Sequence, residues 1–198
     1  RRHPPEFDQG RGSESRHVIS MQMPATPDQA RFYSALLFEI GALHSSNASL
    51  TKLERLARDL LRRIRPRMLI VDEVHHLLAG STREQRASLN LLKYLANDLK
   101  ICIVVVGTSD APIALQTDAQ MANRFIPFEI PRWTENEEFR RLLAAFEKAI
   151  PLRQKSDLTN RATVQFLLAS SGGLTGEVAR LLCDAAVLSI RDGSERIQ

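Results

Sequence analysis

The chain has 198 residues, of which 25% are charged and 43% hydrophobic, and its formal net charge is +4. These values are typical of a globular protein and allow one α/β core with a small appended helical bundle. No apolar run approaches the roughly 18 residues of a membrane span, which excludes an integral helical membrane protein and predicts a soluble, cytoplasmic one. Cys102 and Cys183 show no metal-ligand spacing and are expected to be reduced, buried thiols.

The first elements are a loop, a strand and a helix. Residues 1–15 are rich in proline and glycine and are expected to form an exposed loop. Residues 16–23 ("RHVISMQM") alternate in polarity and end at Pro24, which predicts a strand. Apolar residues at helical spacing predict a helix over 28–43, followed by a polar loop over 44–49.

Residues 50–64 form the clearest amphipathic helix. Its apolar stripe consists of Leu50, Leu53, Leu56, Ala57, Leu60, Leu61 and Ile64. A capping box from Thr51 to Glu54 is expected at its start, and Pro66 ends it. Residues 52–67 carry seven cations and two carboxylates. Such a segment is typical either of a solvated helix face or of a surface that follows phosphates.

Buried strands alternate with helices after this point. Residues 68–72 ("MLIVD") are continuously apolar up to the acid, which predicts a strand of a parallel sheet with both faces covered. A helix over 83–99, a second fully buried strand over 101–108 and a shorter third strand over 124–130 follow. This order predicts an α/β layered domain with right-handed crossovers.

After Pro131 the pattern becomes purely helical. Helices are expected over 134–149, 157–170 and 175–191, the first opened by a capping box that starts at Thr134. The chain is therefore predicted to contain an α/β core over residues 1–131 and a helical subdomain over 132–198.

Two carboxylates follow the strand over 68–72. Ligands of parallel sheets bind at the carboxyl ends of the strands. An apolar strand followed by Asp-Glu is typical of a Walker B segment, in which Asp72 would orient Mg²⁺, often through water, and Glu73 would polarise the attacking water of phosphoryl transfer. The alternative is a pair of plain loop caps. His75 and His76 are adjacent rather than four residues apart, so they are expected to point apart and to form no metal site.

Two further polar residues end or precede strands. Thr108 could hold the lytic water or reach a γ-phosphate, or could belong to a simple turn, "GTSD". Arg124 precedes the third strand and follows a short helical segment. It is either an internal ion-pair partner or an arginine finger that reaches the phosphates bound by a neighbouring subunit.

The chain resembles an AAA+ ATPase in the order of its motifs. These are "MLIVDE", "IVVVGT", "NRF" and a last helix at "SGGLTGEVARLL". Within that superfamily the chain looks most like the TniB/TnsC group, the ATPase regulators of DNA transposition, through "ISMQMPATPD", "FYSALLFEIGA" and "GLTGEVARLLCDAA". The resemblance implies a P-loop NTPase-type parallel sheet flanked by helices and followed by a helical lid, with ATP and Mg²⁺ as cofactors. It makes Asp72 and Glu73 the Walker B pair, Thr108 sensor 1 and Arg124 the finger.

The resemblance also implies a function. The chain would be an ATP-dependent regulator that assembles as a ring or filament on double-stranded target DNA and links target-selection proteins to the transposase. DNA would be contacted between the second and third sheet strands, where Lys52, Arg55 and Arg62 lie opposite the leucine stripe. The alternatives are a replication initiator or helicase loader, a non-hydrolysing ATP-binding scaffold, and an α/β binding module unrelated to nucleotides.

The sequence departs from the AAA+ pattern in two places. No G-x-x-x-x-G-K-[ST] occurs in the 198 residues, so the chain is expected to start after the Walker A motif and its central strand, and to be inactive as a fragment. Gly176 and Glu177 stand where a sensor 2 arginine is often found. Arg180, one turn later, is the candidate lid cation for the nucleotide.

Overall fold

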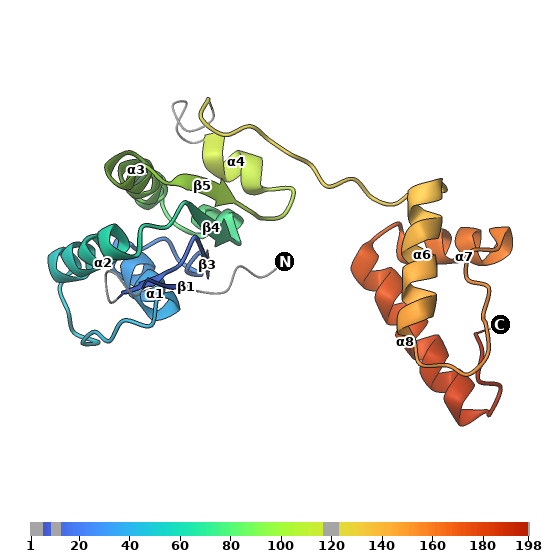
Figure 1. The fold of residues 1–198 in the computed structure, drawn as a ribbon. Helices are drawn as coiled ribbons and strands as arrows, with labels where there is room; N and C mark the ends of the chain where they lie inside the picture. The colour runs from blue at the N-terminus through green and yellow to red at the C-terminus, as the bar shows by residue number, and fades with distance from the viewer. Residues whose placement is uncertain (1–5, 9–12, 117–122, 198) are drawn as a thin grey trace. The chain divides into compact units, whose positions relative to one another are not determined.

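The computed structural model describes residues 6–8, 13–116 and 123–197. The chain divides into two compact units, Arg1–Pro127 and Phe128–Gln198. The first contains every strand of the described residues, and the second is helical (Figure 1). None of the described helices combines the length and apolar character needed to cross a membrane.

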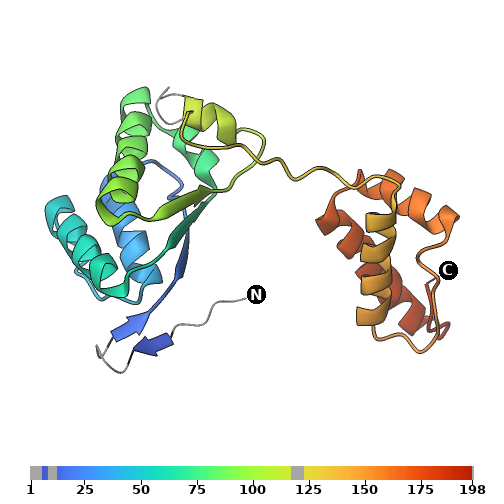
Figure 2. The same cartoon turned by 45° about the horizontal axis from the view of Figure 1, so that its top comes forward.

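Three parallel strands form the centre of the first unit. They are β3 (Val18–Gln22), β4 (Met68–Asp72) and β5 (Cys102–Val105), in the order β3-β4-β5. The helices α1 (Gln29–Glu39), α2 (Leu50–Ile64) and α3 (Thr82–Leu99) lie on one face of this sheet (Figure 2). The predicted α/β fold with a parallel sheet flanked by helices is confirmed.

Only one face of the described sheet is well buried. Leu69 and Val71 point into the core under the helices, whereas Ile70, which alternates with them along β4, is half-buried. The expectation that helices cover both faces is therefore wrong for the described residues. Cys102 is exposed at the start of β5, and Cys183 is exposed on the last helix, so neither thiol is buried as expected.

The predicted third strand is absent. Residues 124–130 show no strand pairing, and Ile126, Phe128 and Ile130 are 94%, 88% and 83% exposed. A strand needs the hydrogen-bonding edge of a neighbouring strand, and no described strand pairs with this segment. The strand β5 is itself half-exposed, and β4 is its only partner among the described strands. The helical segment expected before Arg124 lies outside the described residues.

Helix and turn chemistry differs from the prediction in detail. Residues 6–15 contain a short antiparallel pair, β1 (Glu6–Asp8) with β2 (Ser13–Ser15), rather than only a loop. The α1 helix stops at Glu39, before Gly41, which has a left-handed backbone with φ of 74°. The α2 helix has the predicted bounds, but Ser49 precedes it without a side-chain cap, so the expected capping box is absent.

The second unit is a three-helix bundle. It consists of α6 (Glu137–Ala149), α7 (Arg161–Ser171) and α8 (Thr175–Arg191), which bury Phe139, Leu143, Val164, Leu167, Val178 and Leu182. The α6 and α7 helices begin later than predicted because Asn136 and Asn160 cap them. Their side chains accept hydrogen bonds from the backbone N–H groups of Phe139 (2.8 Å) and Thr163 (2.9 Å).

Candidate functional site

Asp72 is the last residue of β4 and lies at the carboxyl edge of the sheet. Its backbone oxygen accepts a hydrogen bond from the Met23 N–H at 2.8 Å, which ties this end of β4 to the end of β3. The Asp72 side chain is half-buried, and its Oδ1 accepts from the Glu73 N–H at 2.8 Å. No donor among the described residues is paired with Oδ2. This oxygen is therefore available to a hard cation such as Mg²⁺, which prefers carboxylate ligands.

Glu73 turns the chain away from the sheet. Its backbone is left-handed, with φ 56° and ψ 36°, which costs a non-glycine residue on the order of 1 kcal/mol. Hydrogen bonds on both sides hold the turn: Val106 N–H donates to Val71 O and Val74 N–H to Val106 O, each at 2.9 Å. The 3-10 helix η1 (Val74–Ala79) starts immediately afterwards.

His75 joins the ends of β4 and β5. Its Nδ1 lies 3.2 Å from Glu73 Oε2 and 3.5 Å from the Thr108 backbone nitrogen. Gly107 leaves space for this contact, since a Cβ there would lie 3.3 Å from the same nitrogen. Asp72, Glu73 and Thr108 therefore lie along one edge of the sheet, between η1 and the short helix α4 (Ala111–Gln116). The sequence prediction did not identify His75 as a contact of Glu73 and Thr108.

The two histidines do not point apart. Their ring centroids are 5.0 Å from each other, with 59° between the ring planes. His76 Nδ1 lies 3.0 Å from the Met23 carbonyl oxygen, while His75 faces Glu73. These partners, and not the sequence spacing, set the ring orientations.

Arg124 lies away from this edge. Its Nη1 donates to Asn97 Oδ1 at 3.2 Å, in the last turn of α3. The α3 helix starts beside the carboxyl edge and runs back toward the start of β5; its 18 residues span about 27 Å. The first unit therefore does not bring Arg124 to its own Asp72 and Glu73.

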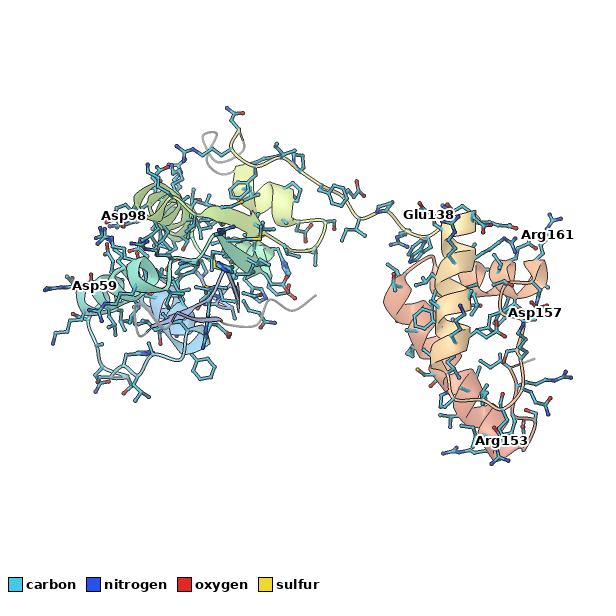
Figure 3. The ribbon with its side chains drawn as sticks, in the orientation of Figure 1. Asp59, Asp98, Glu138, Arg153, Asp157 and Arg161 are labelled. Atoms are coloured by element: carbon cyan, nitrogen blue, oxygen red, sulfur yellow. The ribbon has the colours of Figure 1, made fainter. Side chains whose placement is uncertain are left out.

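The basic helix α2 presents its cations in two different ways. Lys52 and Arg55 are exposed, and no hydrogen bond or ion pair joins their side chains to other described residues. Arg62 instead donates to both oxygens of Asp98, a residue of α3 labelled in Figure 3, at 2.9 and 3.0 Å. Arg58 binds the same carboxylate at 3.0 and 3.2 Å. The hydrogen bond from Arg58, with the charges of Arg58 and Arg62, holds the pKa of Asp98 below its ordinary value.

Arg180 lies on α8 in the second unit and is bound within its own helix. Its guanidinium donates to Glu177 Oε2 at 2.7 and 3.1 Å and approaches Asp184 at 3.4 Å. The Glu177 hydrogen bond raises the pKa of Arg180 above its ordinary value. Glu177, at the position where a sensor 2 arginine is often found, is thus the partner of Arg180.

Comparison with known proteins bears on the first unit. The family model described as bacterial TniB protein matches residues 1–135, which cover the whole α/β unit and end just before α6. No curated protein matches the chain.

Proposed function

Because the chain belongs to the TniB family, a P-loop NTPase-like family associated with transposition, we propose that it is an ATP-dependent, DNA-binding regulator of DNA transposition. The observation that carries this proposal is the placement of Asp72 and Glu73 at the carboxyl end of β4, next to Thr108 on the neighbouring strand end. Parallel sheets bind nucleotides at this edge.

Each residue of the edge has a proposed role in ATP hydrolysis. Asp72 would hold Mg²⁺ through Oδ2, and the bound ion would supply positive charge to the phosphates. Glu73 orients the attacking water and accepts its proton. His75 positions the Glu73 carboxylate, and the exposed Thr108 hydroxyl holds the water or the terminal phosphate.

Arg124 and the helical unit extend the proposal beyond one subunit. The position of Arg124 at the far end of α3 supports a role as a finger on the nucleotide of a neighbouring copy, in a ring or filament. Residues 132–198 would act as the lid, and Arg180 would contact nucleotide by leaving Glu177. The transposase and target-selection proteins are the proposed partners.

The exposed start of α2 is the proposed DNA contact. Lys52 and Arg55 are accessible to the phosphates of double-stranded DNA without breaking any described ion pair. Arg62 would have to leave Asp98 first and is therefore a weaker candidate. The contact would be independent of sequence, because phosphates are common to all DNA.

ATP binding and turnover by the full-length protein test the assignment. Glu73→Gln should retain ATP binding and lose turnover by about 100-fold or more, because it removes the general base. Asp72→Ala should weaken both. Glu39→Gln, the same chemical change at an exposed position of α1, is the control and should match the wild type. Unchanged turnover in both site variants would refute the Walker B assignment. A wild-type protein that binds ATP but does not hydrolyse it would favour the non-hydrolysing scaffold.

A further inference from the structure

The turn after β4 holds a second arrangement of donors that ATP hydrolysis does not require. One side-chain donor atom from each of Glu73, His75 and His76 lies within 4.8 Å of the other two. We propose that these three side chains bind one transition-metal dication of the zinc type. The proposal stands on the geometry of this turn and does not rest on the proposed function.

The distances suit such an ion. His75 Nδ1 and Glu73 Oε2 are 3.2 Å apart. Two ligand atoms on a tetrahedral zinc ion, with bonds of about 2.0–2.1 Å, lie about 3.4 Å from each other. This pair thus already has the spacing of two ligands on one ion, and the third donor, on His76, would be reached by rotations of the Glu73 and His75 side chains.

His76 has the tautomer of a ligand. The Met23 carbonyl, 3.0 Å from Nδ1, can only accept, so Nδ1 carries a hydrogen, and in the neutral ring Nε2 has the lone pair. Histidines that bind metals commonly have one ring nitrogen fixed in this way by a carbonyl or carboxylate. The carbonyl of Met23, the residue after β3, therefore fixes the orientation of the His76 ring before any ion arrives.

His75 lies between groups with opposite demands. Its Nδ1 faces a carboxylate at 3.2 Å, which favours a hydrogen on the nitrogen, and the Thr108 N–H at 3.5 Å, which favours a lone pair. A dication between Nδ1 and Oε2 would bind the carboxylate and accept the lone pair of the unprotonated nitrogen, so that no hydrogen is needed between the two atoms. Two imidazoles with one carboxylate select zinc, cobalt, nickel or copper rather than Mg²⁺, which prefers oxygen ligands only.

The site is open to solvent. The side chains of His75 and Glu73 are 23% and 39% exposed, so an ion can enter and keep water in its remaining positions. One consequence does rest on the proposed function: an ion bound here would occupy the carboxylate assigned to water activation and would slow hydrolysis.

The test is a titration of metal-free protein with Co²⁺, followed by its optical absorption, and then displacement by Zn²⁺, all without nucleotide. The wild type should bind one ion, and His75→Gln and His76→Gln should each bind at least about 10-fold more weakly. His44→Gln is the matched control, because His44 is a half-buried histidine of the same unit that contacts Ser34 at 2.7 Å. It should keep the wild-type affinity.

Wild-type affinity in the double variant His75→Gln/His76→Gln, or an equal loss in His44→Gln, would overturn the proposal. Ring signals in NMR spectra provide a test that needs no variant. Zn²⁺ should shift the signals of His75 and His76 and leave those of His44 in place, and the reverse pattern would refute the site. Since nucleotide is left out, a failure of the ATPase proposal would not change either result.

Discussion

Asp98 binds two arginines of α2 with one carboxylate. Arg58 and Arg62 both donate to it, and the Arg58 guanidinium also lies over the Tyr94 ring, 4.9 Å from its centroid. The Asp98 side chain is only 19% exposed, so water screens this network less than it screens an isolated surface pair. The network joins α2 to the end of α3.

Asp98→Asn should therefore lower the free energy of unfolding by about 1 kcal/mol at pH 7. The folded-state pKa of Asp98 is below its ordinary value of 3.8, so its stabilisation is present above that value and is lost as the pH falls toward the folded pKa. Urea unfolding of wild type and variant should show a difference that shrinks below about pH 4.

Asp59→Asn is the control for this measurement, because Asp59 is an exposed carboxylate on the same pair of helices (Figure 3). It should change stability little at either pH. A difference between wild type and Asp98→Asn that is the same at pH 3 and pH 7 would contradict the role given to the charged carboxylate.

At the scale of single elements, α2 and α3 begin in different ways. Ser81 and Glu84 form a complete capping box at the start of α3, with Glu84 Oε2 2.7 Å from the Ser81 N–H nitrogen and Ser81 Oγ facing the Glu84 N–H. Ser49 occupies the same cap position before α2 but makes no side-chain cap bond. The two serines therefore form a natural matched pair.

Ser81→Ala should cost about 1 kcal/mol of unfolding free energy, because it leaves the Glu84 N–H without its side-chain acceptor. Ser49→Ala should change stability by no more than a few tenths of a kcal/mol, since no cap bond is lost. Thermal and urea unfolding of the two variants would compare them directly. Equal losses would show that the cap geometry of α3 has no energetic effect.

For the whole molecule, the position of Arg124 predicts activity shared between subunits. Arg124→Ala protein should be inactive alone in the full-length form, and so should Glu73→Gln protein. A mixture of the two should recover part of the turnover, because the Glu73→Gln subunit supplies an intact finger to a neighbour with an intact Glu73. If the proteins co-assemble, as measured by light scattering, and no turnover returns, Arg124 does not act between subunits.

DNA binding is predicted to depend on the start of α2. Lys52→Ala/Arg55→Ala should weaken ATP-dependent binding to nonspecific duplex DNA and flatten its salt dependence by about one unit of slope per lost contact. Arg62→Ala removes one cation, as Arg55→Ala does alone, and it should have a smaller effect than Arg55→Ala because Asp98 already holds Arg62. Wild-type affinity and slope in the double variant would refute the assignment, as long as assembly is unchanged.

The sequence by itself determined the features that are local in the chain. The apolar period of residues 50–64 and the apolar run of residues 68–72 gave α2 and β4 with their observed bounds. Because this apolar run ends at Asp72, the sequence also predicted that the Asp-Glu pair lies at the end of a strand. Helices satisfy their own backbone hydrogen bonds, so a good helical pattern needs little else to be correct.

The tertiary structure alone decided which side chains meet. Asp98 binds Arg62, which is 36 residues away in the sequence, and the Thr108 N–H lies near His75, which is 33 residues away. No regular spacing in the sequence predicts either contact. Residues 124–130 contain the apolar residues that a strand can bury, yet a strand depends on pairing with another strand and none of the described strands pairs with them. Burial, charge compensation and strand pairing are properties of neighbours in space, which is why the sequence pattern could not fix them.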